Sequence, residues 1–184
     1  MDGSRTVELP LMINQVVLRP VAEADLQLLH RLFTDPADTG EHEWRGWQDT
    51  RWLRRQWDED GLLSRDNGML MVACGDDRLG YVGWHRRATG GQSSFWEIEI
   101  GLAPEARGHG HGTEAQRQLA RYLFAHTQVN RVEAETEITN IAEQRALEKA
   151  GFTREGVRRG AMFRHGQWHD AVIYGLLRHE VDLQ

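Results

Sequence analysis

The spacing of apolar residues changes several times along the chain, and each change predicts a new element. Alternating or short continuous apolar runs predict strands at 15–19, 69–74, 79–85, 95–102, 131–136, 152–159 and 168–177. Apolar residues three and four positions apart predict helices at 23–33, 48–57, 113–124 and 140–150. This order of strands and helices predicts an α/β or α+β fold with a partly antiparallel sheet.

The stretch from 95 to 124 combines a strand, a glycine-rich loop and a helix. Its loop carries Gly108, Gly110 and Gly112 at intervals of two. Glycines allow the backbone to approach a ligand closely, and the first turn of a helix has N–H groups without partners. The combination predicts an anion site, most often one for phosphate. The strand before the loop and the strand at 131–136 should pair in parallel, because a helix connects them.

Two common phosphate motifs do not fit this loop. A dinucleotide fingerprint needs Gly-x-Gly-x-x-Gly, but Thr113 and Ala115 occupy the positions where its third glycine would fall. A P-loop needs Gly-Lys followed by Ser or Thr, and no such sequence follows here. The interpretation that remains is a pyrophosphate cradle at the start of a helix.

Length and composition favour one domain. The chain has 184 residues, 40% of them apolar, and 4 prolines, which suits a single core over 15–184 preceded by a loose lead-in at 1–14. Cys74 is the only cysteine, so no intrachain disulfide can form. No apolar run reaches the roughly 18 residues that span a bilayer, and the first residues lack the pattern of a secretion signal. We therefore expect a cytoplasmic protein without a membrane partner.

The formal net charge of −6 bears on the choice of partner. Proteins that bind nucleic acid through its phosphates normally present a basic face, so this charge argues against such a partner. It suits cationic partners such as amines, and it equally suits an ordinary solvated surface.

The glycine-rich loop and its surroundings resemble the GNAT superfamily of acyl-CoA-dependent N-acyltransferases. The superfamily signature Gln/Arg-x-x-Gly-x-Gly/Ala is matched by Arg107, Gly110 and Gly112. Further matches to its RimJ/RimL-like branch of ribosomal-protein N-terminal acetyltransferases lie at 99–101, 104–108, 112–115, 140–142 and 147–152. The resemblance covers residues 15–178. It implies a mixed, mostly antiparallel central sheet flanked by helices, with a parallel strand pair that splays apart at the cofactor site.

The resemblance also implies a site for acetyl-CoA. Backbone N–H groups of the loop would hold the pyrophosphate, Arg107 would pair with a phosphate, and the backbone at Ile100 and Leu102 would bind the pantetheine arm. Asn140 would lie beside that arm while also capping its own helix. The loop residues in question are Gly108, His109, Gly110, His111, Gly112 and Thr113. We expect no metal, because His109 and His111 have no third ligand in view.

Two acids on the strand before the loop are candidates for the catalytic base. Alternation places Glu97 and Glu99 on one face of that strand, opposite Ile98 and Ile100. An amine is mostly protonated at neutral pH, so a base must remove a proton before the amine attacks the thioester directly. Glu99 is preferred, because it is closer to the cofactor loop. The competing interpretation is a pair of solvated acids on an exposed sheet face.

The segment before and around the second predicted helix is a candidate acceptor site. Trp44, Trp47 and Glu41 would line it, since aromatic residues are enriched in ligand pockets and an acid suits a cation. Core packing is the alternative for these tryptophans, and the favoured one for Trp52 and Trp57. The acceptor would be a protein N-terminus or a small amine such as an antibiotic or polyamine. The oligomeric state stays open, with a homodimer as one candidate.

The group that protonates the departing thiolate is missing from the expected positions. The resemblance places a tyrosine or a serine on the helix at 140–150, but Leu147 and Glu143 stand there instead. We interpret Glu143 as the second half of a capping box with Asn140. This departure keeps a second hypothesis open, a non-catalytic module that binds or senses acyl-CoA. A third hypothesis is a nucleotide-binding protein of another fold.

Overall fold

The computed structural model describes residues 15–91 and 93–183, so the lead-in predicted at 1–14 lies outside the described residues. Within them, seven strands form one sheet in the order β1-β2-β3-β4-β5-β7-β6. The strands are β1 (Val16–Pro20), β2 (Asn67–Cys74), β3 (Asp77–Gly90), β4 (Ser93–Leu102), β5 (Arg131–Glu137), β6 (Thr153–Arg164) and β7 (Gln167–Leu177). The α-helices are α1 (Leu26–Thr34), α2 (Pro36–Thr39), α3 (Arg51–Asp60), α4 (His111–His126) and α5 (Ile141–Ala150). Short 3-10 turns are η1 (Glu23–Asp25), η2 (Pro104–Ala106) and η3 (Arg178–Glu180).

One parallel pair interrupts an otherwise antiparallel sheet. Residues Trp96–Ile98 of β4 pair in parallel with Val132–Ala134 of β5, and the other neighbouring strands pair antiparallel. Beyond Ile98 the two strands separate: β4 runs on to Leu102 without β5, while β5 stays paired with β7 as far as Glu137. The predicted mixed sheet and its splayed parallel pair are therefore confirmed.

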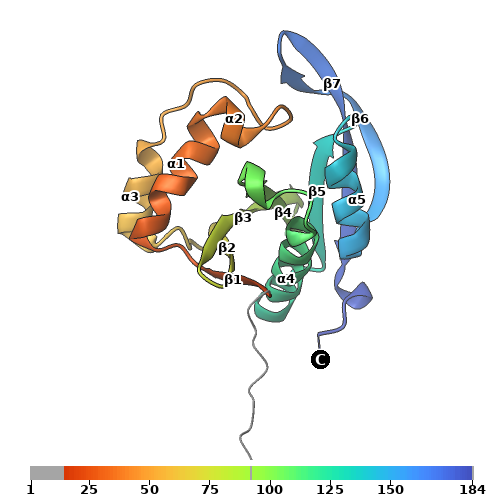
Figure 1. Cartoon of the computed structure of the whole chain (residues 1–184). Helices are drawn as coiled ribbons and strands as arrows, with labels where there is room; N and C mark the ends of the chain where they lie inside the picture. Colours follow the sequence, from red (N-terminus) through yellow and green to blue (C-terminus); the bar gives the residue numbers. More distant parts are fainter. Residues whose placement is uncertain (1–14, 92, 184) are drawn as a thin grey trace, which may run out of the picture.

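Helices cover both faces of the sheet (Figure 1). On one face, Trp96 and Ile98 of β4 pack in a cluster with Leu119 and Leu123 of α4 and with Leu147 of α5. On the other face, Met71 and Tyr81 pack with side chains of α1 and α3, among them Leu29 and Leu53. Trp52 and Trp57 lie against this second cluster, which confirms their predicted packing role. The acids of β4 point toward the face that α1 and α3 cover, because they alternate with Trp96 and Ile98.

Local hydrogen bonds explain where the helices differ from prediction. No helix was predicted between 33 and 48, but α2 forms there because the Asp35 side chain accepts a 2.9 Å bond from the Ala37 N–H and Pro36 stands in the first turn. The helix expected at 48–57 begins at Arg51, because the Asp49 side chain binds the Arg51 N–H at 2.9 Å. It ends at Gly61, a glycine with φ of 68°.

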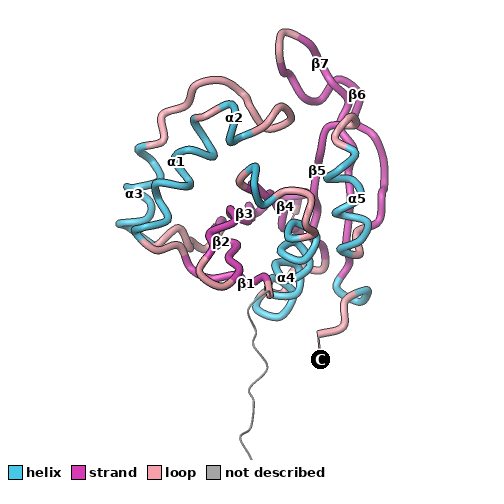
Figure 2. The backbone as a smooth tube through the Cα atoms, in the orientation of Figure 1, coloured by secondary structure: helices cyan, strands magenta, loops and turns pink. Residues whose placement is uncertain are grey.

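Two hairpins are longer than predicted. The segment 88–94 was expected to be a loop, yet β3 extends to Gly90 and β4 starts at Ser93 because backbone pairing continues through Ala88 and Ser94. The β6–β7 hairpin also runs further than the predicted strands, and Figure 2 shows it rising beyond the rest of the sheet. Its turn falls between the strands predicted at 152–159 and 168–177, where His165 and Gly166 both have positive φ.

Candidate active site

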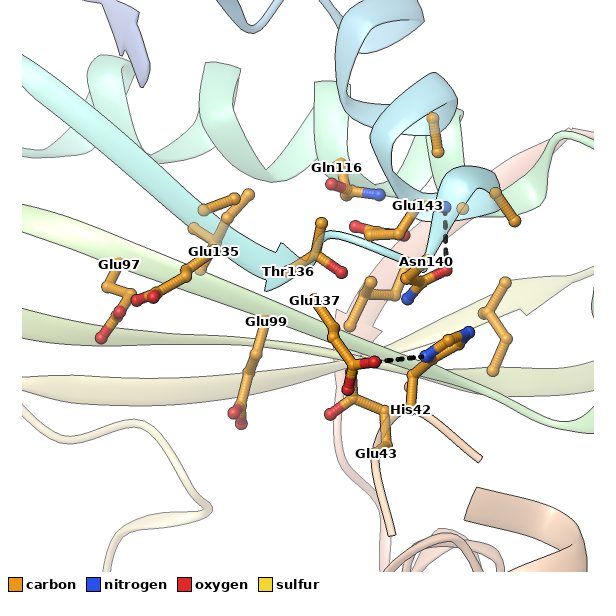
Figure 3. Close-up of a pocket in the computed structure, with 18 of the residues that line it drawn as sticks. His42, Glu43, Glu97, Glu99, Gln116, Glu135, Thr136, Glu137, Asn140 and Glu143 are labelled. Carbon is orange, nitrogen blue, oxygen red and sulfur yellow. Dashed lines mark hydrogen bonds and ion pairs between the residues drawn. The ribbon is translucent and has the colours of Figure 1, made fainter. Parts of the chain in front are cut away.

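A cleft of about 1480 Å³ opens where β4 and β5 separate. Its walls come from the loop after α2, from β3 and β4, from the start of α4, and from β5 and α5. Figure 3 shows the polar side chains that enter it. The cleft therefore joins the predicted cofactor loop and the predicted acids in one space.

The glycine-rich loop forms a bare helix start. Gly110 is the residue before α4 and has φ of 83°, Gly108 has φ of 80°, and no side chain caps the helix. A Cβ at Gly112 would touch the side chains of Leu102 and Ile100 at 3.5 and 3.6 Å, so the first turn of α4 lies against the end of β4. The uncapped start of this 16-residue helix lines the cleft at Gly110, Gly112 and Thr113, an arrangement suited to an anion.

Arg107 lines the cleft but binds backbone carbonyls. Its Nε donates to the Leu102 carbonyl at 2.9 Å, and its Nη2 donates to the carbonyls of Asp38 and Thr39. The guanidinium therefore ties α2 to the end of β4. The predicted contact of Arg107 with a phosphate stays a prediction.

The two candidate bases have different neighbours. Glu97 forms an ion pair with Arg87 of β3. Glu99 has no arginine partner among the ion pairs of the described residues, and its Oε1 lies 3.5 Å from Nε2 of His85. The pKa of His85 is raised, first because of its hydrogen bond to Glu99, against the opposing effect of burial. The position next to an imidazole, open to the cleft, supports Glu99 over Glu97.

Room for the Glu99 carboxylate depends on Gly83. This glycine pairs with Glu99 across β3 and β4, and a Cβ there would come within 2.8 Å of the Glu99 Oε1. Tyr81, the next residue on the same face of β3, is buried and lines the cleft. Burial raises the pKa of Tyr81 well above its usual range, and the charges of Glu99 and Glu43 add to that effect.

The loop after α2 contributes a further acidic wall. Glu43 lines the cleft with a side chain that is 51% exposed, and partial desolvation by the surrounding walls is the first cause that raises its pKa. The charge of Glu99 raises that pKa further, against the lowering effect of Arg45. Glu41 also lines the cleft. The ring centroids of Trp44 and Trp47 are 5.2 Å apart, but Trp47 is 81% exposed.

A buried ion network holds the end of β5. Glu137 is 2% exposed and accepts hydrogen bonds from Arg164 at 2.7 and 2.9 Å and one from Thr139 at 2.5 Å. His169 lies 3.3 Å from the same carboxylate, and His42 lies 3.9 Å away. Hydrogen bonds from Arg164 are the main reason that the pKa of Glu137 falls to about 2. This network connects the β6–β7 hairpin to the loop after α2.

The wall opposite the acids comes from α4, β5 and α5. Asn140 caps α5 as predicted, because its side chain accepts a 3.2 Å bond from the Glu143 N–H. The capping box also predicted a hydrogen bond from the Asn140 N–H to the Glu143 side chain. This part of the prediction is wrong, because the Asn140 N–H donates to the Glu137 carbonyl at 2.9 Å. The Glu143 carboxyl instead lies in the cleft beside Gln116 (Figure 3).

The structure brings most of the predicted site residues to this cleft, but not all. Those that line it are Glu41, Glu97, Glu99, Ile100, Leu102, Arg107, Gly108, Gly110, Gly112, Thr113 and Asn140. His109, His111 and Trp47 lie outside its lining, and Trp44 lines a smaller cavity of about 200 Å³ next to it.

Several lining residues were missed by the sequence analysis. They are Tyr81, His85, Gln116, Glu135, Thr136 and Glu137. The register of the β3–β4 hairpin would have indicated His85, because it pairs with Glu97. No sequence pattern indicates Gln116 or Thr136, which reach the cleft through helix and strand packing.

Metal binding and membrane spanning are considered for the described part of the chain, 15–91 and 93–183. No group of three or more His, Cys, Asp or Glu side chains there is arranged to hold a metal ion. No helix there has the length and apolar character needed to cross a bilayer.

Comparison with known proteins gives consistent matches. Residues 15–153 match the family model described as an acetyltransferase (GNAT) domain. YdaF of Bacillus subtilis (strain 168), provisionally named a ribosomal N-acetyltransferase, is 36% identical over 84 residues, which are 46% of this chain and 46% of YdaF. YoaA of the same organism, named an uncharacterized N-acetyltransferase, is 30% identical over 118 residues, 64% of this chain and 61% of YoaA. The chain thus spans about half to three fifths of these curated relatives.

Solved structures share the fold over nearly the whole chain. The spermidine N-acetyltransferase of Vibrio cholerae, solved with CoA and spermine, superposes with a TM-score of 0.73 at 19% sequence identity. The superposition covers 90% of this chain and 97% of the Vibrio cholerae chain. The ribosomal L7/L12 α-N-protein acetyltransferase RimL, solved with CoA, gives a TM-score of 0.73 at 18% sequence identity. This superposition covers 92% of this chain and 96% of the RimL chain. At such identities the likeness concerns the fold.

Proposed function

The chain belongs to the acetyltransferase (GNAT) family, and from this premise we propose that it transfers an acetyl group from acetyl-CoA to a cationic primary amine. The predicted family is thereby confirmed, and the names of YdaF and RimL agree with the predicted RimJ/RimL-like branch. Acetyl-CoA is the co-substrate in this proposal.

The cofactor would enter along the start of α4 and the end of β4. The uncapped backbone from Gly108 to Thr113 would hold the pyrophosphate, with the helix dipole adding to the attraction. Among the described residues, β4 has no strand partner on its β5 side after Ile98. Its backbone at Ile100 and Leu102 would therefore bind the pantetheine arm like an added strand, although the Leu102 carbonyl already accepts a hydrogen bond from Arg107. The thioester would then reach the place where β4 and β5 separate.

The acceptor would occupy the acidic side of the cleft. Glu41, Glu43, Glu97 and Glu99 line it together. Carboxylates at this density favour a positively charged acceptor and repel an anionic one. A polyamine or a basic protein N-terminus fits this chemistry better than a neutral amine does.

Glu99 would act as the base for the amine. The amine must lose a proton before its nitrogen attacks the thioester carbonyl, and Glu99 accepts that proton directly or through one water. His85 would hold the carboxylate in place, since its ring nitrogen lies 3.5 Å from the Glu99 Oε1. The attack forms the amide and releases coenzyme A without a covalent enzyme intermediate.

One observation carries this proposal: the bare start of α4 and the acids of β4 open into the same cleft at the β4–β5 separation. The direct experiment is a screen for acetyl-CoA-dependent release of free thiol against polyamines, peptides with free N-termini and aminoglycoside-type amines. We expect turnover with cationic amines.

The same screen separates the alternatives. Thermal stabilisation by acetyl-CoA without turnover on any amine would favour a binding or sensing module. Thermal stabilisation of the protein by NAD or ATP, but not by acetyl-CoA, would contradict the proposed co-substrate.

A further inference from the structure

Glu143 presents a carboxyl to the cleft that the capping of its own helix does not use. It stands in the first turn of α5, where an acid often reaches back to the N–H of the capping residue. That N–H is already taken, because Asn140 donates it to the Glu137 carbonyl at 2.9 Å. The Glu143 side chain is therefore available to a ligand in the cleft.

Two buried polar side chains beside Glu143 lack a well-formed hydrogen bond, although Gln116 also interacts with the Glu143 carboxyl. Gln116 of α4 is 1% exposed, and Thr136 of β5 is 3% exposed. Within the described residues, neither the Gln116 Nε2 nor the Thr136 Oγ1 makes a hydrogen bond of normal geometry. Both residues line the cleft with Glu143, and Figure 3 shows the three side chains gathered together. Buried polar groups without partners are costly, so this arrangement indicates a place that a ligand completes.

Glu143 and Glu99 approach the cleft from opposite faces of the sheet. The Glu99 side chain points to the face covered by α1 and α3, because it alternates with the buried Ile98. Glu143 belongs to α5, which packs on the other face through Leu147. A thioester in the gap between β4 and β5 would therefore have one carboxyl group on each side.

The surroundings of Glu143 raise its pKa toward neutral pH, so that a substantial fraction of the carboxyl is still protonated there. Burial is the main reason that its pKa rises to about 7, the charge of Glu43 adds to the rise, and Gln116 opposes it. The other charged or titratable groups that line this part of the cleft are His42 from the loop after α2, Glu99 from β4, Glu135 and Glu137 from β5, and Arg145 and Lys149 from α5 itself. A carboxyl with a pKa near the working pH is well matched to donate a proton.

We propose that Glu143 gives its proton to the sulfur of the departing coenzyme A, while Gln116 and Thr136 position that sulfur. This inference rests on the proposed acetyl transfer. The amine nitrogen bonds to the carbonyl carbon, the carbon–sulfur bond breaks, and its electron pair stays on sulfur. Glu143 protonates that sulfur. Glu99 passes the first proton of the ammonium group to solvent before the attack, and it takes the second proton from the nitrogen as the amide forms. The products are the amide and the free thiol, and both carboxyl groups then return to their starting states by exchange with solvent.

Replacing Glu143 by Gln tests this role in the full chain. The variant keeps the size and the hydrogen-bonding shape but carries no acidic proton. We expect kcat with acetyl-CoA to fall roughly 100-fold while the acetyl-CoA Kd stays within about threefold. In the unaltered protein kcat should decline as the pH rises above about 7, and this decline should disappear in Glu143→Gln. Glu143→Asp should restore part of the rate and of the pH dependence.

A matched control uses Glu59→Gln, because Glu59 is exposed on α3 and lies outside the cleft lining. It should behave like the unaltered protein. An unchanged kcat in Glu143→Gln, or a kcat that keeps its decline above pH 7, would overturn the proposal.

A second measurement requires no acceptor. The pKa of the thiol of bound coenzyme A, followed by ultraviolet absorbance of the thiolate, should be lower in Glu143→Gln, since the ionised carboxylate no longer opposes the thiolate charge. An equal thiol pKa in both proteins would place the sulfur away from Glu143 and overturn the inference. Failure of the acetyl transfer itself is distinguishable, because it would appear as absent turnover of the unaltered protein on every amine.

Discussion

His85 on β3 and Glu99 on β4 are diagonal neighbours across an antiparallel strand pair, one pairing step apart, with Nε2 and Oε1 3.5 Å apart. The pairing raises the pKa of His85, so the ion pair is fully present below the ordinary histidine value and is lost as the pH rises through the raised value. Both side chains are more than one third exposed, so the pair orients the Glu99 carboxylate and adds little to stability.

The first prediction concerns Glu99 as the base. Glu99→Gln should lower kcat roughly 100-fold, because the amine loses its proton acceptor, while acetyl-CoA binding stays the same. Titration of the His85 ring by NMR should show its pKa falling toward the ordinary value in this variant. Glu97→Gln is the matched comparison: Glu97 is paired with Arg87, so its replacement should lower kcat about tenfold or less. A larger loss in Glu97→Gln than in Glu99→Gln would reverse the assignment.

The second prediction concerns the glycine before α4. Gly110 has φ of 83°, so Gly110→Ala should destabilise the protein by about 1–2 kcal/mol and distort the N–H groups that face the cleft. The acetyl-CoA Kd, measured by calorimetry, should rise about tenfold, a change of about 1.4 kcal/mol. Gly61→Ala imposes similar strain at φ of 68° outside the cleft, so it should cost stability without changing that Kd. An unchanged Kd in Gly110→Ala would remove this helix start from the cofactor site.

The third prediction concerns the buried pair of Glu137 and Arg164. The pKa of Glu137 is lowered to about 2, so its stabilising effect is present above the ordinary glutamate value and is lost as the pH falls toward 2. Arg164→Gln should lower the free energy of unfolding by about 3 kcal/mol at neutral pH and move acid unfolding to higher pH, as measured by urea titration across that range. Arg51→Gln removes an exposed pair with Asp49 and should leave the unfolding curve unchanged. Equal curves for the two variants would contradict this account.

The fourth prediction concerns acceptor charge. Glu43→Gln removes one carboxylate from the cleft and should raise KM for acceptors with several positive charges about fivefold, a loss of about 1 kcal/mol. KM for acceptors with a single charge should change less, because they depend on fewer of the acids. Steady-state kinetics over a series of amines of rising charge measures this difference. A KM that changes equally along the series would argue against recognition of the acceptor by charge.

Local pattern in the sequence determined the elements and the cofactor half of the candidate site. The period of apolar residues indicated every strand, because burial on one or both faces of a sheet leaves a pattern within a few residues. The glycines from Gly108 to Gly112 indicated the bare helix start for the same reason: the backbone conformation they allow is a local property. The short α2 escaped prediction, since its four residues are too few to show a period.

Only the tertiary structure decided which side chains meet. His85 reaches Glu99 through strand register, and Glu143 meets Gln116 and Thr136 through the packing of α4 and α5 against the sheet. The sequence suggested a capping role for Glu143, but whether its carboxyl turns back to the helix depends on the Glu137 carbonyl that takes the Asn140 N–H. Contacts between distant segments depend on register and helix packing, which local propensity does not contain. The candidate anion-binding loop and the candidate base Glu99 could therefore be predicted from the sequence, whereas the position of the Glu143 carboxyl in the cleft became apparent only in the fold.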